Sequence, residues 1–97
     1  MDMETLMAQA QDLQEKISQA QDSLAKMHVK GIANSGAVVV TMTGKYDVLS
    51  VVVHPDAISF GADKVSQMVM DAYKDAKSKA DELIDKVMSS VTGGMTE

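Results

Sequence analysis

A long amphipathic segment near the start of the chain, residues 3–27, limits most strongly what this sequence can fold into. Apolar residues recur there at spacings of three and four, the heptad pattern of a helix that lies against another helix. The seam consists of Met3, Leu6, Ala10, Leu13, Ile17, Ala20, Leu24 and Met27. The segment contains neither Gly nor Pro and is rich in strong helix formers. Such a helix is about 37 Å long, whereas a strand of six or seven residues spans only about 20 to 23 Å. The seam must therefore extend beyond a small sheet, and its apolar residues need a partner.

Two valine-rich segments in the middle of the chain predict strands. Residues 37–43 and 48–53 have the β-branched content of strands, and Gly44–Asp47 between them is short enough for an antiparallel hairpin. A short extended segment at 29–32 precedes them, separated by the turn residues Asn34-Ser35-Gly36. The centre of the chain therefore predicts a small β-sheet.

Both alternating sets of side chains in these strands are apolar. Val38 and Val40 lie on one side of the first strand and Val39 on the other, and Val51 and Val52 divide the next strand in the same way. A sheet that is apolar on both faces is covered on both. Because the two helices of one chain cover one face well, we expect the second cover to come from another subunit.

A second helix is predicted from about Asp63, a good N-cap, to about Val91, and Gly93-Gly94 is expected to stop it. Its main apolar stripe consists of Val65, Val69, Ala72, Ala76, Leu83 and Val87. A second apolar flank lies about 100° around the axis and consists of Met70, Tyr73, Ile84, Met88 and Val91. Two stripes indicate two neighbours, which again favours an oligomer.

The composition excludes several classes of protein. The 97 residues make one domain, and the absence of cysteine excludes a disulfide framework, thiol catalysis and zinc–thiolate sites. The segment around Asp2 and Glu4 is acidic, and no apolar run approaches the roughly 18 residues of a membrane span. We therefore expect neither a signal peptide nor a membrane segment, and a cytoplasmic protein.

No arrangement of residues in the sequence indicates catalysis, a metal or a cofactor. Gly36 and Gly44-Lys45 are too far apart for a phosphate-binding loop, and Tyr46 stands where Ser or Thr is required. His28 and His54 lack the spacing of metal ligands on a helix. The acidic and basic residues of the second helix, including the i,i+4 pairs Asp75–Lys79 and Glu82–Lys86, are interpreted as a solvated face.

The charged residues give two alternatives for a partner. The net charge is −5, from fourteen acidic and nine basic residues, and all nine basic residues are Lys. Without Arg there is no obvious agent for bidentate reading of guanine, so a DNA contact should be to the backbone. The lysines either serve solubility and pairing within the chain, or they contact phosphates.

A series of short motifs in register resembles the YbaB/EbfC family of bacterial nucleoid-associated proteins over nearly the whole chain. The motifs are Leu6-Met7-Ala8-Gln9-Ala10-Gln11, Leu13-Gln14-Glu15-Lys16, Val29-x-Gly31, Thr43-Gly44, Val51-Val52-Val53-His54-Pro55 and Met88-Ser89-Ser90-Val91-Thr92-Gly93-Gly94-Met95. The chain differs from many members in carrying Leu49-Ser50 where they have paired basic residues.

The resemblance implies an α+β fold of one helix, a three-stranded antiparallel sheet and a long helix, in an intertwined homodimer whose helices project. It also implies a nucleoid protein that binds duplex DNA with low sequence specificity, with a possible role in chromosome organisation and gene regulation. The expected DNA contacts are Lys16, Lys26, Lys79 and Lys86, with Lys30 and Lys45. The expected dimer interface includes Leu13, Ile17, Val39, Val51, Met70 and Ile84. The alternative is an acidic dimeric module that docks a protein of the DNA repair or replication machinery.

Overall fold

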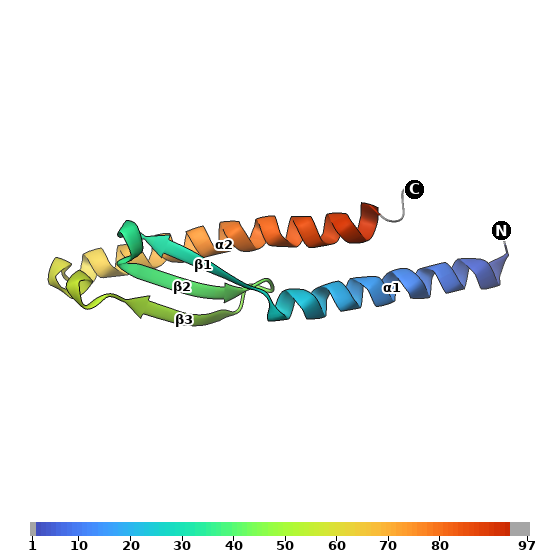
Figure 1. Ribbon diagram of the computed structural model, residues 1–97, viewed down its shortest axis with the longest axis horizontal. Helices are drawn as coiled ribbons and strands as arrows, with labels where there is room; N and C mark the ends of the chain where they lie inside the picture. The colour runs from blue at the N-terminus through green and yellow to red at the C-terminus, as the bar shows by residue number, and fades with distance from the viewer. Residues whose placement is uncertain (1, 94–97) are drawn as a thin grey trace.

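The computed structural model describes residues 2–93, which form two long helices and one three-stranded sheet (Figure 1). The elements in chain order are α1 (Met3–Lys26), β1 (His28–Ala33), the 3₁₀ turn η1 (Asn34–Gly36), β2 (Val38–Thr43), β3 (Val48–Val53), the 3₁₀ segment η2 (Pro55–Phe60) and α2 (Ala62–Gly93). The expected α+β order of helix, three strands and long helix is confirmed. Gly94, which was expected to help stop α2, lies outside the described residues.

The sheet has the order β1-β2-β3, and both pairings are antiparallel. The register pairs Ile32 with Val39 across β1 and β2, and Val39 with Val52 across β2 and β3. The β2–β3 ladder shifts between Thr41 and Met42, which leaves Leu49 as an extra residue in β3. The Leu49-Ser50 departure noted in the sequence therefore coincides with a β-bulge.

Helix α2 packs on one face of the sheet, over β1 and β2 (Figure 1). Val38, Val40 and Met42 are the fully buried side chains of β2, and they face the helix. The buried residues of α2 are Met68, Ala72, Ala76 and Ala80. Of the predicted main stripe, Ala72 and Ala76 are buried, while Val65, Val69, Leu83 and Val87 are half-buried. Met68 and Ala80 were missing from that prediction, because the contact with the sheet follows a narrow row of alanines.

The close approach of α2 to the sheet depends on Gly31 in β1. A Cβ at this position would lie 1.9 Å from the carbonyl oxygen of Ala72 and 2.4 Å from the backbone nitrogen of Ala76. Because glycine and alanine meet here, the backbones of β1 and α2 touch with no larger side chain between them.

Helix α1 extends away from the sheet instead of covering it (Figure 1). The described chain measures 68 × 20 × 16 Å with a radius of gyration of 19.0 Å, whereas a compact domain of this length has about 13 Å. The seam of α1 is buried only near its end, at Ala20 and Leu24, half-buried at Leu13 and Ile17, and open at Met3. The predicted overhang of the seam is thereby confirmed.

Candidate nucleic-acid interface

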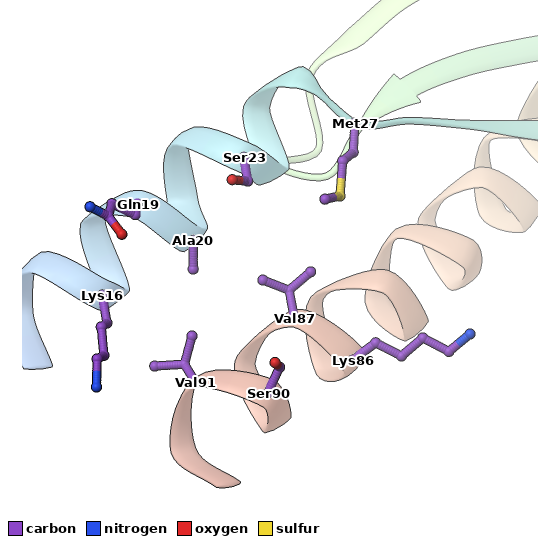
Figure 2. A pocket seen from close by; sticks show the side chains of 9 residues that line it. All are labelled: Lys16, Gln19, Ala20, Ser23, Met27, Lys86, Val87, Ser90 and Val91. Carbon is purple, nitrogen blue, oxygen red and sulfur yellow. The ribbon is translucent and has the colours of Figure 1, made fainter. Parts of the chain in front are cut away.

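A cleft of about 520 Å³ lies between the second half of α1 and the last turns of α2 (Figure 2). Its walls come from antiparallel segments of the two helices, since α1 runs toward the sheet and α2 runs away from it (Figure 1). The cleft is lined by Lys16, Gln19, Ala20, Ser23, Met27, Lys86, Val87, Ser90 and Val91. Apolar side chains of the two helices, Ala20, Val87 and Val91, lie toward one another across it in Figure 2.

Polar groups around the cleft include the two lysines that were expected to contact DNA from different helices. Lys16 lines it from α1 and Lys86 from α2, and Lys86 extends away from α1 in Figure 2. The Lys16 Nζ lies 3.3 Å from Asp12 Oδ2, but both side chains are about half exposed or more, at 49% and 64%. An exposed pair of this kind is weak, so a phosphate can replace the carboxylate at little cost.

Lys79 and Lys30 are engaged differently from the expected contacts of a free cationic patch. The Lys79 Nζ donates to the backbone carbonyl oxygen of Lys30 at 2.8 Å and pairs with Asp75 Oδ2 at 3.0 Å. The same Asp75 oxygen accepts a hydrogen bond from the backbone N–H of Ile32 at 2.9 Å. The interpretation of Asp75 and Lys79 as a merely solvated face was incomplete, because both also bind the outer edge of β1.

The environment of Asp75 is visible in its ionisation. The backbone N–H of Ile32 and, after it, the ammonium group of Lys79 lower the pKa of the Asp75 carboxyl below its ordinary value of 3.8. The carboxylate is therefore ionised at neutral pH. It acts as the link that holds the β1 edge to α2.

Lys26 and Lys45 lie near the root of α1, where the β2–β3 turn meets both helices. The backbone N–H of Gly44 donates to the carbonyl oxygens of Leu24 and Met27, at 3.0 and 3.1 Å, and so caps the end of α1. The Tyr46 hydroxyl donates to Asp81 of α2, and this hydrogen bond raises the Tyr46 pKa. A second hollow of about 320 Å³ beside the turn is lined by Gln21, Leu24, Gly44, Lys45, Tyr46, Ile84 and Met88.

The structure thus brings together only some of the expected site residues. Lys16 and Lys86 share one cleft, and Lys45 lines another hollow. Lys79 is held at the β1 edge with the backbone of Lys30. The hydroxyls of Ser23 and Ser90 also line the main cleft, and the sequence gave no signal for them because serine is common on exposed helix faces.

The residues expected at a dimer interface are accessible to a partner. Met70 is 55% exposed and Val51 47% exposed, and Leu13, Ile17, Val39 and Ile84 are half-buried. The interface itself stays a prediction.

In the part of the chain that the structure describes, no group of three or more His, Asp or Glu side chains is arranged to hold a metal ion. Among the same residues, no helix has the length and apolarity needed to cross a membrane.

The fold recurs in a solved structure. An uncharacterized protein from Helicobacter pylori matches with a TM-score of 0.74 and 13% sequence identity, over 100% of this chain and 99% of that one. At this identity the match shows the fold alone, and it places the chain in a class of small α+β proteins in which two long helices flank a three-stranded sheet.

Sequence comparisons give the family. The pattern of the YbaB/EbfC DNA-binding family matches residues 1–95. A nucleoid-associated protein of Gloeothece citriformis (strain PCC 7424) is 37% identical over 86 residues, which cover 89% of this chain and 75% of the relative. A nucleoid-associated protein of Bordetella avium (strain 197N) is 38% identical over 90 residues, covering 93% and 83% respectively. The chain belongs to the YbaB/EbfC DNA-binding family, a non-enzymatic kind of protein.

Proposed function

We propose that this chain forms a homodimer that binds duplex DNA through its sugar–phosphate backbone, with low sequence specificity, as a protein of the nucleoid. Membership of the YbaB/EbfC DNA-binding family over residues 1–95 is the observation that carries the proposal. The two named relatives are both nucleoid-associated proteins. Organisation of the chromosome and effects on gene regulation follow from binding of this kind.

The residues of the cleft support contact with the DNA backbone in place of reading of bases. Lys16 and Lys86 supply point charges, and Gln19, Ser23 and Ser90 supply neutral hydrogen-bonding groups. Such groups contact phosphate oxygens without carrying sequence information. The chain has no Arg, so the commonest bidentate contact to guanine is missing.

The amount of exposed surface supports the dimer. The chain exposes 6810 Å², whereas a compact monomeric protein of 10.4 kDa exposes about 5,400 Å². The excess of about 1,400 Å² is larger than the roughly 800 Å² that each partner buries in a standard interface. Part of this surface is apolar, including Leu6, Val52 and Met70, which favours its burial against a second copy.

Charge sets the expected salt dependence. A dimer carries −10, twice the −5 of one chain, so general attraction to DNA is weak and binding depends on local lysine–phosphate contacts. Each such contact releases counterions, so that the logarithm of the affinity falls by about 0.9 per contact for each tenfold rise in salt. A band-shift titration with a duplex of mixed sequence at several salt concentrations tests the proposal. Binding at low salt that weakens as salt rises supports it, and no shift at low salt by a folded protein overturns it.

A charge-matched pair of variants locates the contact. Replacing Lys16→Glu and Lys86→Glu together is expected to weaken DNA binding at least tenfold and to reduce the salt slope. The control replaces Lys64→Glu and Lys74→Glu, which lie on the exposed side of α2 and change the net charge equally. Equal loss in both double variants would show that net charge, and not the cleft, governs binding.

The alternative function, docking of a protein of the DNA repair or replication machinery, has one specific observation in its favour. The first turns of α1 expose Met3 (75%), Leu6 (48%) and Met7 (59%), and acidic residues such as Glu4 lie beside them. An affinity capture from nuclease-treated lysate distinguishes the two functions. A partner retained without nucleic acid, and lost in Leu6→Asp, favours docking. Capture that disappears with nuclease favours DNA.

A further inference from the structure

The two edges of the sheet differ in how their backbone groups are satisfied. On β1, the outward carbonyl of Lys30 accepts from Lys79 and the outward N–H of Ile32 donates to Asp75. Two side chains of α2 thus occupy the hydrogen-bonding positions that another strand would need. The β1 edge is closed by its own helix, which prevents pairing with a further strand.

The β3 edge has outward-pointing backbone groups at two neighbouring positions. The N–H of His54 donates to the carbonyl oxygen of Ala37 at 2.7 Å, which makes these residues a hydrogen-bonded pair. Hydrogen-bonded and non-hydrogen-bonded pairs alternate in an antiparallel ladder. Val52 therefore bonds inward to β2, and the N–H and C=O groups of Val51 and Val53 point outward, away from β2.

The side chains of β3 give the edge an apolar surface on both faces. Helix α2 packs over β1 and β2 and leaves Val48 (46%), Leu49 (52%), Val51 (47%) and Val52 (59%) exposed. No residue of β3 is charged, and none is proline. Long, flat, uncharged edges are normally blocked by charges, prolines or bulges. The bulge at Leu49 lies at the start of β3, so residues 51–53 remain a regular edge.

We propose that β3 pairs antiparallel with β3 of a second copy of this chain, which joins the two sheets into one of six strands in the order β1-β2-β3-β3-β2-β1. A second copy fits because a two-fold axis brings identical surfaces together, and a charge-free strand meets no repulsion from itself. This inference rests on the dimer of the proposed function and specifies its interface.

The outward groups also fix the register of the pairing. Val51 of one copy pairs with Val53 of the other, and the reverse pair follows from the two-fold axis, so that four hydrogen bonds form and the bulge stays outside the ladder. Val52 then lies on the axis opposite its own counterpart, in a non-hydrogen-bonded pair with about 4.5 Å between the Cα atoms. That separation lies within the range that a disulfide spans.

The absence of cysteine from the chain allows a direct test with single-cysteine variants of the full-length protein. Val52→Cys is expected to form a disulfide-linked dimer under mild oxidation, seen on a non-reducing gel. Ser50→Cys is the matched control, because it lies on the same face of β3 but about 13 Å from its counterpart in this register. Light scattering on the untreated wild-type protein is measured in parallel.

The outcomes separate this inference from the proposed function. A wild-type dimer with efficient cross-linking of Val52→Cys alone supports the pairing. A wild-type dimer in which Val52→Cys does not cross-link, or cross-links no better than Ser50→Cys, overturns the pairing and leaves the proposed dimer intact. A wild-type mass near 10.4 kDa overturns the dimer and the pairing together.

A pair of lysine variants gives an independent measurement. Val51→Lys is expected to raise the dimer dissociation constant at least tenfold, because two buried charges would face each other beside the axis. Ile32→Lys on the closed β1 edge is the control, since Ile32 is equally exposed at 47%, and its dissociation constant should stay within about twofold. Far-UV circular dichroism checks that both variants keep their fold. Equal weakening in both variants would contradict the assignment of the interface to β3.

Discussion

At the scale of single residues, Gly31 shows how one position holds the sheet and α2 together. Its missing side chain allows β1 to touch the backbone of α2 at Ala72 and Ala76. Buried alanines on the facing helix complete the contact. The sequence offered only a glycine in a short extended segment, and the reason for that glycine lies in the neighbouring helix.

Replacement Gly31→Ala is expected to destabilise the fold by about 2–3 kcal/mol, because the new Cβ collides with backbone atoms that cannot move aside cheaply. For a domain of this size the melting temperature should fall by roughly 10–20 °C, measured at matched protein concentration. Gly36→Ala is the control: its φ of +98° strains a side chain, but a Cβ there meets nothing within 4 Å. A smaller loss for Gly31→Ala than for Gly36→Ala would contradict the packing argument.

Asp75 is a second residue whose role depends on the fold, and its effect should vary with pH. Its folded-state pKa lies below 3.8, so its stabilisation is present above that value and is lost as the pH falls through the folded-state pKa. Asp75→Ala should reduce the free energy of unfolding at pH 7 by about 0.5–1 kcal/mol, a modest figure because Asp75 and Lys79 are 39% and 43% exposed.

The pH profile provides the check on this prediction. The difference in stability between wild type and Asp75→Ala should be constant above about pH 5 and shrink below pH 4, as measured by urea denaturation. Asp71→Ala, one turn earlier on the same exposed helix, should change stability by less than about 0.5 kcal/mol. A difference that grows in acid would mean that the Asp75 carboxylate does not link β1 to α2.

At the scale of elements, the β2–β3 turn connects both long helices to the sheet. Gly44 caps the end of α1 through two backbone hydrogen bonds, and Tyr46 binds α2 at Asp81. Thr43 organises the turn by accepting hydrogen bonds from the backbone N–H groups of Lys45 and Asp47. The direction in which α1 projects is therefore set by a hairpin, with little help from packing along α1 itself.

Gly44→Ala should separate this turn from α1, because its Cβ would lie 2.8 Å from the Leu24 carbonyl oxygen and 2.9 Å from a Leu24 methyl group. We expect a stability loss of about 1–3 kcal/mol and faster hydrogen exchange at the end of α1, residues 20–26, than in α2. Lys45→Ala at the neighbouring exposed position should leave exchange in α1 unchanged. Uniformly faster exchange in both helices of Gly44→Ala would contradict a local role.

At the scale of the whole molecule, an elongated shape and an uncovered apolar strand belong together. The radius of gyration of 19.0 Å reflects helices that extend beyond the sheet, and β3 is left open by the only helix that covers the sheet. The same geometry separates two kinds of interaction. The proposed dimer contact is apolar, and the proposed DNA contact at Lys16 and Lys86 is ionic.

Salt should therefore act on the two interactions in opposite ways. Raising salt from 50 to 500 mM should leave the dimer dissociation constant unchanged or slightly lower it, because burial of β3 removes no charges from water. Over the same range DNA affinity should fall by more than tenfold. Analytical ultracentrifugation and fluorescence anisotropy measure the two constants separately. Dissociation of the dimer by salt would contradict an interface built on β3.

Much of the fold could be predicted from periodicity. The three- and four-residue spacing of apolar side chains predicted α1 and α2, and the valine-rich runs predicted β2 and β3, with bounds within one or two residues of those observed. These patterns are local, and local patterns are what helices and strands require. The candidate site was less accessible to prediction, because six lysines of similar sequence context proved to have different surroundings.

The sequence by itself determined the kinds of elements, their order, the surplus of apolar surface and the absence of any catalytic arrangement. Only the tertiary structure decided which lysines share a cleft, that Asp75 and Lys79 close one edge of the sheet, and that β3 stays open. These features depend on distances between residues more than forty positions apart in the chain, such as Lys79 and Lys30, and no local pattern encodes them.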